Sequence, residues 1–257
     1  MALWPIVLPA AGIGAGLAVW GAVAPSSELF GPTIRRTGAR STVALTFDDG
    51  PNPGLTPQLL DLFQRHDVRA TFFVLGRWAK ACPELVREIA CRGHEIGNHT
   101  ETHPRLALLP AARIERELAE CRSHVREALG GESQGERSIS WMRPPFGFRG
   151  PQLAGAVQRA GLRGVAMWSL TCYDWKPQPP AALIERLGRV LGKGAYTATG
   201  GRKGGEVVLL HDGDFRALDA DRNHVLVALK YWLPRWRDAG VNFATITEVA
   251  NRLQAGS

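Results

Sequence analysis

The sequence predicts an α/β fold in which parallel strands alternate with helices and form an incomplete (β/α) barrel. Three observations support this prediction. Short, β-branched apolar runs alternate with longer segments whose apolar residues have helical spacing. There are about seven such runs, fewer than the eight strands of a closed barrel. Polar side chains that suit catalysis follow several of the runs directly, and barrel active sites form at the carboxyl ends of the strands.

The composition favours one globular domain with a positively charged surface. The chain has 257 residues, of which 45% are hydrophobic and 21% are charged, enough for one large folded core. Its 31 Lys and Arg residues exceed its 24 Asp and Glu residues, so the formal net charge is +7. No cluster of Lys and Arg is interleaved with aromatic residues, and no nucleic-acid-binding motif occurs. We therefore expect no nucleic-acid partner, and we predict no particular oligomeric state.

The first half of the chain alternates between strands and helices. Strands are expected at 42–47, 70–75 and 94–98, and helices at 57–66, 83–92 and 110–129. The first helix has apolar residues at helical spacing, namely Leu59, Leu60, Leu62 and Phe63. Pro83 suits the first position of the second helix, where its missing N–H costs no hydrogen bond. The third helix carries many Glu and Arg residues, which we expect to form ion pairs on a solvated face.

The same alternation continues in the second half. Strands are expected at 141–143, 164–169, 206–210 and 242–244, and helices at 151–160, 180–191, 221–238 and 247–253. Gly161 follows the first of these helices at the position where a glycine C-cap is expected. Polar and Gly-rich loops are expected at 130–138 and 192–205.

Residues 2–24 form an uncharged, apolar stretch that is long enough to cross a bilayer as a hydrophobic helix. Ala22-Val23-Ala24 resembles a signal-peptide cleavage site, but no Lys or Arg precedes the stretch and Pro25 follows it. We therefore predict a transmembrane anchor or uncleaved signal over 1–24. A linker over 25–40 and a catalytic domain over 41–252 follow.

Two adjacent carboxylates end the first expected strand. Asp48 and Asp49 are followed by Gly50 and Pro51, a strong turn signal. In a dry site, two neighbouring carboxylates raise each other's pKa unless a cation lies between them. The pair therefore indicates a metal site, a general base or both. Considered alone, it is equally compatible with a solvated turn.

Histidines follow two other strands. His99 and His103 lie four residues apart, in a loop or on one helical face, and can bind one cation together. Thr100 follows His99, so the pattern differs from the His-Glu-x-x-His of zinc proteases. His211 follows a buried β run near the end of the chain. Histidines and acids at the ends of several strands of one sheet indicate a shared site.

Five short motifs follow one another along the chain. They are Thr46-Phe47-Asp48-Asp49-Gly50-Pro51, His99-Thr100-Glu101-Thr102-His103, Arg143-Pro144-Pro145-Phe146-Gly147, Asp174-Trp175 and Leu209-Leu210-His211-Asp212. In this order they resemble the motifs of the polysaccharide deacetylase family, the NodB homology domain of carbohydrate esterase family 4. The resemblance covers about residues 41–252. It implies a distorted, incomplete barrel and a metal-dependent hydrolase.

The resemblance assigns the metal ligands. Asp49, His99 and His103 match the family's ligand positions, and the expected ion is zinc, with cobalt, nickel or manganese as alternatives. Such a metal lowers the pKa of a water molecule and polarises a substrate carbonyl.

The resemblance also assigns the proton-transfer groups. Asp48 matches the general base and His211 the general acid. Arg143 would orient Asp48 through paired hydrogen bonds, and Asp174 would raise the pKa of His211. Many members carry a further acid three residues before the Asp-Trp pair, where this chain has Thr171.

Three residues match the family's substrate-binding positions. A backbone N–H near Phe146 would donate to the oxyanion, and this donor does not depend on the Tyr that many members have there. Trp175 and Leu209 would form an apolar groove for the acetyl methyl group.

The predicted protein is a membrane-anchored deacetylase that releases acetate from an acetylated oligo- or polysaccharide. N-acetyl groups on N-acetylglucosamine of peptidoglycan or chitin-like chains are the expected target, with O-acetyl groups as an alternative. The sequence is also compatible with a lipid-linked sugar or a non-sugar amide as the substrate, and with a catalytically silent carbohydrate-binding role. The catalytic domain should lie outside the cytoplasm, although Arg35, Arg36 and Arg40 after the span favour the opposite orientation.

Overall fold

Parallel strands form one curled, open sheet. The computed structural model of the chain describes residues 16–131, 139–191 and 205–256. The strands are β1 (Thr33–Ile34), β2 (Thr42–Gly50), β3 (Thr71–Val74), β4 (Glu95–Asn98), β5 (Trp141–Met142), β6 (Gly164–Ala166), β7 (Leu170–Thr171), β8 (Val207–His211) and β9 (Asn242–Phe243). Their order is β1-β6-β5-β4-β3-β2-β8-β7 with parallel pairing throughout, and β9 pairs with the start of β2. The predicted incomplete barrel is confirmed.

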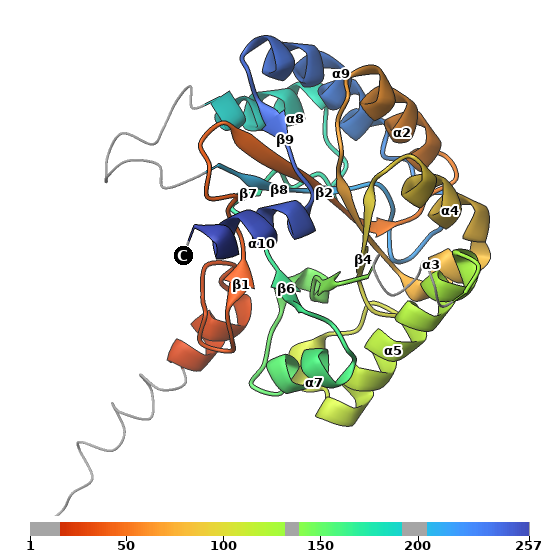
Figure 1. Cartoon of the computed structure of the whole chain (residues 1–257), viewed down its shortest axis with the longest axis vertical. Helices are drawn as coiled ribbons and strands as arrows, with labels where there is room; N and C mark the ends of the chain where they lie inside the picture. The colour runs from red at the N-terminus through yellow and green to blue at the C-terminus, as the bar shows by residue number, and fades with distance from the viewer. Residues whose placement is uncertain (1–15, 132–138, 192–204, 257) are drawn as a thin grey trace, which may run out of the picture.

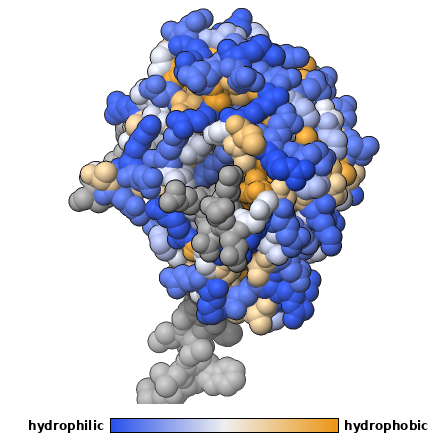
Figure 2. Space-filling model, turned by 45° about the vertical axis from the view of Figure 1, so that its right-hand side comes forward, coloured by the Kyte–Doolittle hydropathy of each residue, from blue (hydrophilic) through white to orange (hydrophobic). Residues whose placement is uncertain are grey.

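Helices cover the outer face of the sheet (Figure 1). They are α2 (Thr56–Arg65), α3 (Gly76–Ala81), α4 (Pro83–Cys91), α5 (Ala111–Ala128), α7 (Leu153–Arg159), α8 (Pro180–Leu187) and α9 (Asn223–Asp238), and α10 (Ile246–Ala255) follows α9 outside this layer. Between the sheet and these helices lies the main core, where the Phe47 ring is 5.1 Å from Phe72 and 5.6 Å from Phe63. The face seen in Figure 2 is mostly hydrophilic, with hydrophobic residues in small patches.

The last helix closes the end of the barrel where the strands begin. β9 pairs with Thr42 and Val43 at the start of β2, and Thr245 then caps α10 in a reciprocal capping box with Glu248. The inner face of α10 belongs to a second buried cluster with the barrel interior, formed by Ala44, Phe73, Trp141, Ala166, Val207, Ala244, Ile246, Val249 and Ala250. This end is therefore packed with apolar groups, which leaves the opposite end for polar chemistry.

β2 is the central strand of the molecule. All nine of its residues are buried, and β3 and β8 pair on either side of it. The register places Asp48 opposite His211 of β8. On the β3 side the register shifts between Asp48 and Gly50, and Asp49 has a φ of 69°. Such an irregularity redirects side chains, so the two adjacent carboxylates need not point the same way.

Some boundaries differ from the prediction. The strand expected at 164–169 is shorter: β6 ends at Ala166 and a separate strand, β7, begins at Leu170, because β6 pairs with β1 and β5 whereas β7 pairs with β8. The helix expected at 180–191 is α-helical only to Leu187, and a 3-10 turn follows over Gly188–Leu191. α3 was not predicted because its six residues are too few to show a helical period.

The segment before the barrel is tied to it. Residues 25–40, predicted as a linker, contain β1, which pairs with β6. The buried Arg149 donates a hydrogen bond of 2.6 Å to the backbone carbonyl of Ser27. Residues 2–15, most of the predicted anchor, lie outside the described residues. Within the part of the chain that the structure describes, no helix combines the length and apolarity needed to cross a bilayer.

Candidate active site

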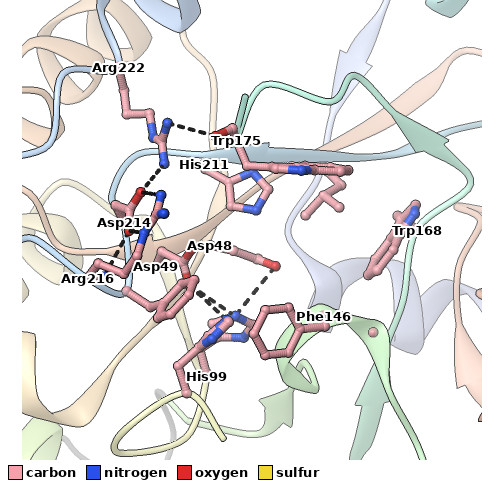
Figure 3. Close-up of a pocket in the computed structure, with 14 residues that line it drawn as sticks. Asp48, Asp49, His99, Phe146, Trp168, Trp175, His211, Asp214, Arg216 and Arg222 are labelled. Atoms are coloured by element: carbon pink, nitrogen blue, oxygen red, sulfur yellow. Dashed lines mark hydrogen bonds and ion pairs between the residues drawn. The ribbon is translucent and has the colours of Figure 1, made fainter. Parts of the chain in front are cut away.

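The carboxyl ends of the central strands surround a cavity of about 330 Å³ (Figure 3). Most of the predicted site residues line it, namely Asp48, Asp49, His99, His103, Phe146, Trp175, Leu209 and His211. The other two lie behind the wall, each hydrogen-bonded to a lining residue: Arg143 to Asp48 and Asp174 to His211. All ten predicted residues therefore belong to one cluster.

Three side chains on one side of the cavity form a metal-binding group. Oδ1 of Asp49 lies 3.4 Å from Nε2 of His99 and 3.2 Å from Nε2 of His103. One ligand atom from each of these buried residues lies within 4.8 Å of the other two. Among the described residues, Oδ1 of Asp49 has no hydrogen-bond partner although it is buried. A carboxylate and two imidazoles placed in this way fit a divalent metal.

The protonation states of this group suit metal binding. Nδ1 of His99 lies 2.8 Å from the carbonyl oxygen of Arg143, a contact that fixes the ring and leaves Nε2 for a metal. Burial and the interaction with His99 lower the pKa of His103 to about 3, although Asp49 acts in the opposite direction. Burial tends to raise the pKa of Asp49, but its contacts with the surrounding histidines outweigh that effect and lower it. At neutral pH the group offers a carboxylate and a neutral His103.

The loop that carries the two histidines is held by its own polar groups. Thr100 and His103 have φ values of 72° and 63°, so the segment is a loop and not a helix. Oδ1 of Asn98 accepts the N–H of Thr100, whose hydroxyl accepts the N–H of His103. Glu117 of α5 accepts hydrogen bonds from the N–H and hydroxyl of Thr102. Left-handed, non-Gly residues persist where the surrounding structure holds them, which is common at functional sites.

Asp48 is held in place by a buried arginine. Nη1 of Arg143 donates to Oδ1 of Asp48 at 2.9 Å and to the hydroxyl of Thr46 at 2.7 Å. The expected paired contact with Asp48 does not form, because Nη2 donates instead to the carbonyl of Met167 at 3.1 Å. Oδ2 of Asp48 lies 3.9 Å from Nε2 of His99. One oxygen of Asp48 is thus anchored and the other faces the metal-binding group.

Both carboxylate oxygens of Asp174 contact His211. Oδ1 of Asp174 is 3.0 Å from Nδ1 of His211, and Oδ2 accepts the backbone N–H of the same residue at 2.6 Å. Burial lowers the pKa of His211, but the charge and hydrogen bond of Asp174 outweigh burial and raise it to about 9. His211 is therefore an imidazolium at neutral pH. Thr171, three residues before Asp174, has a buried hydroxyl without a partner among the described residues.

The three predicted substrate-binding residues line the cavity. The ring of Phe146 meets His103 edge-on at 4.5 Å, and its φ of 58° belongs to the left-handed region. Among the described residues, no backbone carbonyl accepts the N–H of Phe146. Trp175 meets His211 edge-on at 5.5 Å, and the buried Leu209 lies two residues before that histidine on β8. An apolar wall therefore adjoins the proposed acid.

Several lining residues were not predicted. They are Trp168, Asp214, Phe215, Arg216 and Arg222. Phe215 stacks on His103 with ring centroids 4.3 Å apart. Asp214 and Phe215 follow the end of β8 closely, so their position at a strand end was an available signal. Trp168 lies just after β6 but inside the strand expected at 164–169, and Arg222 follows no strand, so neither position was recognisable as a site position.

Asp212 has a structural role beside the site. It is fully buried, and its Oδ2 accepts the hydroxyl of Thr56 at 2.5 Å. Burial raises its pKa to about 7, although the bond from Thr56 acts in the opposite direction. A Cβ on Gly50 would lie 2.3 Å from Oδ2 of Asp212, so this close packing requires a glycine.

Comparisons with known proteins agree with this geometry. Residues 35–165 match the family model for polysaccharide deacetylase. A chitooligosaccharide deacetylase of Sinorhizobium fredii is 34% identical over 214 residues, which are 81% of this chain and 92% of the relative.

Two solved structures extend the similarity to the fold. The Bc1960 peptidoglycan N-acetylglucosamine deacetylase, solved with a hydroxamate-type benzamide, superposes with a TM-score of 0.69 at 29% identity, over 84% of this chain and 91% of that one. An acetyl xylan esterase of Clostridium thermocellum, solved with a cobalt ion, has a TM-score of 0.64 at 28% identity, over 81% and 89%.

Proposed function

The chain belongs to the polysaccharide deacetylase family and is a hydrolase of carbohydrate esterase family 4, and we propose that it removes N-acetyl groups from N-acetylglucosamine units. Chitooligosaccharides and peptidoglycan are the proposed substrates, since relatives named for each are similar along most of the chain. One observation carries the proposal. The metal-binding group, the Asp48–Arg143 pair and the Asp174–His211 pair all meet at one cavity.

Asp49, His99 and His103 would hold a divalent metal, for which we propose zinc. That ion would supply Lewis-acid activation of water and of the acetamide carbonyl. Asp48 is the general base and accepts a proton from the attacking water. Its hydrogen bond from Arg143 fixes one oxygen, so the other stays directed toward the metal-binding group.

His211 supplies the proton that the leaving group needs. Amide hydrolysis breaks the carbon–nitrogen bond, and the departing amine must be protonated as it leaves. His211 is protonated at neutral pH because Asp174 raises its pKa to about 9. The backbone N–H of Phe146 is the proposed donor to the oxyanion, and Trp175 and Leu209 are the proposed contacts for the acetyl methyl group. The products are acetate and a free amine on the sugar.

Acetate release tests this proposal. The metal-free protein should release no acetate from N-acetylglucosamine oligomers or peptidoglycan, and added zinc should restore release. Release that chelators do not affect would contradict metal dependence. A metal-loaded protein that releases acetate from neither substrate would defeat the proposed activity, whereas acetate from O-acetylated xylan alone would change the target from N-acetyl to O-acetyl groups.

We also propose that residues 2–24 anchor the protein in a membrane with the catalytic domain outside the cytoplasm. The support is the uncharged, apolar sequence of that stretch. The full chain should sediment with membranes and resist an alkaline carbonate wash, and protease added to intact cells should cleave the catalytic domain. Release of the protein by the wash would contradict the membrane anchor. Protection of the catalytic domain from protease would show that it faces the cytoplasm instead.

A further inference from the structure

Two of the three acidic groups that line the cavity are paired with arginines, and the third belongs to the metal-binding group. Among the described residues, the acids that line the cavity are Asp48, Asp49 and Asp214. Asp48 is paired with Arg143, and Asp49 belongs to the metal-binding group. With a metal bound at Asp49, a negatively charged substrate would therefore meet no uncompensated carboxylate on entering the cavity.

Asp214 is paired with more positive charge than it can balance. Arg216 donates to both of its oxygens, at 3.0 Å and 2.8 Å, and Arg222 donates to Oδ2 at 2.9 Å (Figure 3). One carboxylate and two guanidiniums carry a net charge of +1. Arg222 is buried and also donates to the carbonyls of Gly213 and Trp175, whereas the side chain of Arg216 is 70% exposed. The surplus charge therefore faces solvent at the cavity through Arg216.

Arg105 provides a second positive charge, separated from Arg216 by the rings of Phe146 and Phe215. The rings of Phe146 and Phe215 are 5.7 Å apart, and both contact His103. Cζ of Arg216 lies 5.5 Å from the Phe215 ring centre, and Cζ of the exposed Arg105 lies 5.4 Å from that of Phe146. No carboxylate of the described residues lies within ion-pair distance of Arg105, so its charge is available to a ligand.

We propose that Arg105 and Arg216 make the enzyme prefer acetylated sugars that carry an anionic group, a carboxylate or a phosphate, next to the acetylated unit. This inference rests on the proposed deacetylase function and specifies its substrate class. The two arginines act on the part of the substrate outside the reacting acetamide. Because both are exposed, their attraction is moderate and falls as salt screens it.

Matched substrate pairs test this preference on the metal-loaded full chain. One pair is N-acetylglucosamine 1-phosphate and methyl N-acetylglucosaminide, and the other is an N-acetylglucosamine–N-acetylmuramic acid disaccharide and its carboxyl methyl ester. We expect kcat/KM for the anionic member of at least one pair to be higher by about fivefold, the upper range of one exposed ion pair. The pair that shows the preference identifies phosphate or carboxylate as the recognised group. In 0.5 M salt the preference should fall toward one.

Variants assign the preference to the two arginines. Arg105→Gln breaks no ion pair among the described residues and should lower the anionic-to-neutral ratio by about two- to threefold. Arg216→Gln breaks the ion pair with Asp214, which keeps Arg222 as a partner, and should lower the ratio by about the same factor. Arg116→Gln, on the exposed face of α5, is the matched control and should leave the ratio unchanged. Metal content and melting temperature check that each variant is folded.

Three results would overturn the inference. Equal kcat/KM within both pairs would show that the cavity mouth does not select charge. A preference that survives both glutamine variants would assign it to other residues. Acetate release from neither member of either pair, while uncharged chitooligosaccharides are deacetylated, would also reject it, and no release from any sugar would instead reject the deacetylase function.

Discussion

The cavity has two sides, and a buried histidine lies next to a carboxylate on each. On one side the pKa of His103 is lowered to about 3, and on the other the pKa of His211 is raised to about 9. Asp49 is shared between His99 and His103, whereas Asp174 directs both of its oxygens to His211. Burial lowers the pKa of both histidines; the shared Asp49 does not offset burial and the neighbouring His99 at His103, whereas the charge and hydrogen bond of Asp174 outweigh burial at His211. His103, which shares Asp49 with His99, is therefore a neutral ligand, and His211, which has Asp174 to itself, stays protonated and can act as an acid.

The largest expected effect comes from breaking the metal-binding side. His103→Ala removes a ligand, so bound metal should be lost. Acetate release should fall by more than about 100-fold, because losing even a residue that only hydrogen-bonds to a metal ligand can lower activity by about that factor. Metal analysis of the purified protein and acetate release measure the two effects. His66→Ala, after α2 and outside the cavity, is the control and should keep both. Full metal occupancy in the His103 variant would contradict the ligand assignment.

Breaking the other side should separate chemistry from metal binding. His211→Ala removes the proposed acid but no metal ligand, so kcat should fall by about 10²–10⁴-fold while metal content stays unchanged. The same two measurements apply. A variant that loses its metal would show that His211 belongs to the metal site instead.

A conservative change at Asp174 should alter pH dependence more than structure. His211 acts while protonated, so activity is present below its pKa and is lost as the pH rises through it. Asp174→Asn removes the charge that raises this pKa, and the alkaline limb of kcat should move down toward the ordinary value of about 6.5. A divalent metal held by Asp49, His99 and His103 would lower the pKa of His211 in wild type and variant alike, so the difference between the two pH profiles is the informative quantity. Coincident profiles would contradict the assigned role of Asp174.

The smallest expected effect concerns the support of Asp48. Thr46 accepts a hydrogen bond from Arg143 and donates one of 2.6 Å to the carbonyl of Val208. Thr46→Val removes both bonds, so one buried N–H of Arg143 loses its acceptor while Asp48 still accepts the other, and the free energy of unfolding should fall by about 1–3 kcal/mol in urea titrations. In this variant, the alkaline limb of the kcat–pH profile, which is assigned to His211, should stay at the wild-type pH. Thr46→Ser retains the hydroxyl and should behave like the wild type, and an equal loss in both variants would contradict the hydrogen-bond explanation.

The clustering of the two sides could be predicted from the sequence because each residue lies in a short motif at a strand end. Asp48 and Asp49 follow β2, and His211 ends β8, the strand beside it. Parallel strands bring such ends together whatever the lengths of the connecting helices. The choice between loop and helix for the His99 segment could not be made from the sequence, because it depends on hydrogen bonds that the loop donates to Asn98 and to Glu117 of α5.

The mouth of the cavity could not be predicted in the same way. Arg222 lies eight positions after Asp214 in the sequence, and the segment between them is irregular. No periodic pattern in the sequence therefore predicts that the two side chains meet. Arg105 comes near the site only through the ring of Phe146. The end of β6 at Ala166 and the start of β7 at Leu170 could not be predicted either, since this break follows from pairing with distant parts of the chain.

The contrast between the two histidines can be measured directly by NMR titration of protein with ¹⁵N-labelled histidine, in the metal-free and zinc-loaded forms. His103→Ala and His211→Ala assign the two signals. At pH 7.5 in the metal-free protein, the ring of His211 should be an imidazolium and that of His103 neutral, and zinc should perturb His103 directly. A neutral His211 in both forms, or a protonated His103 in the metal-free protein, would contradict the division of roles between the two sides of the cavity.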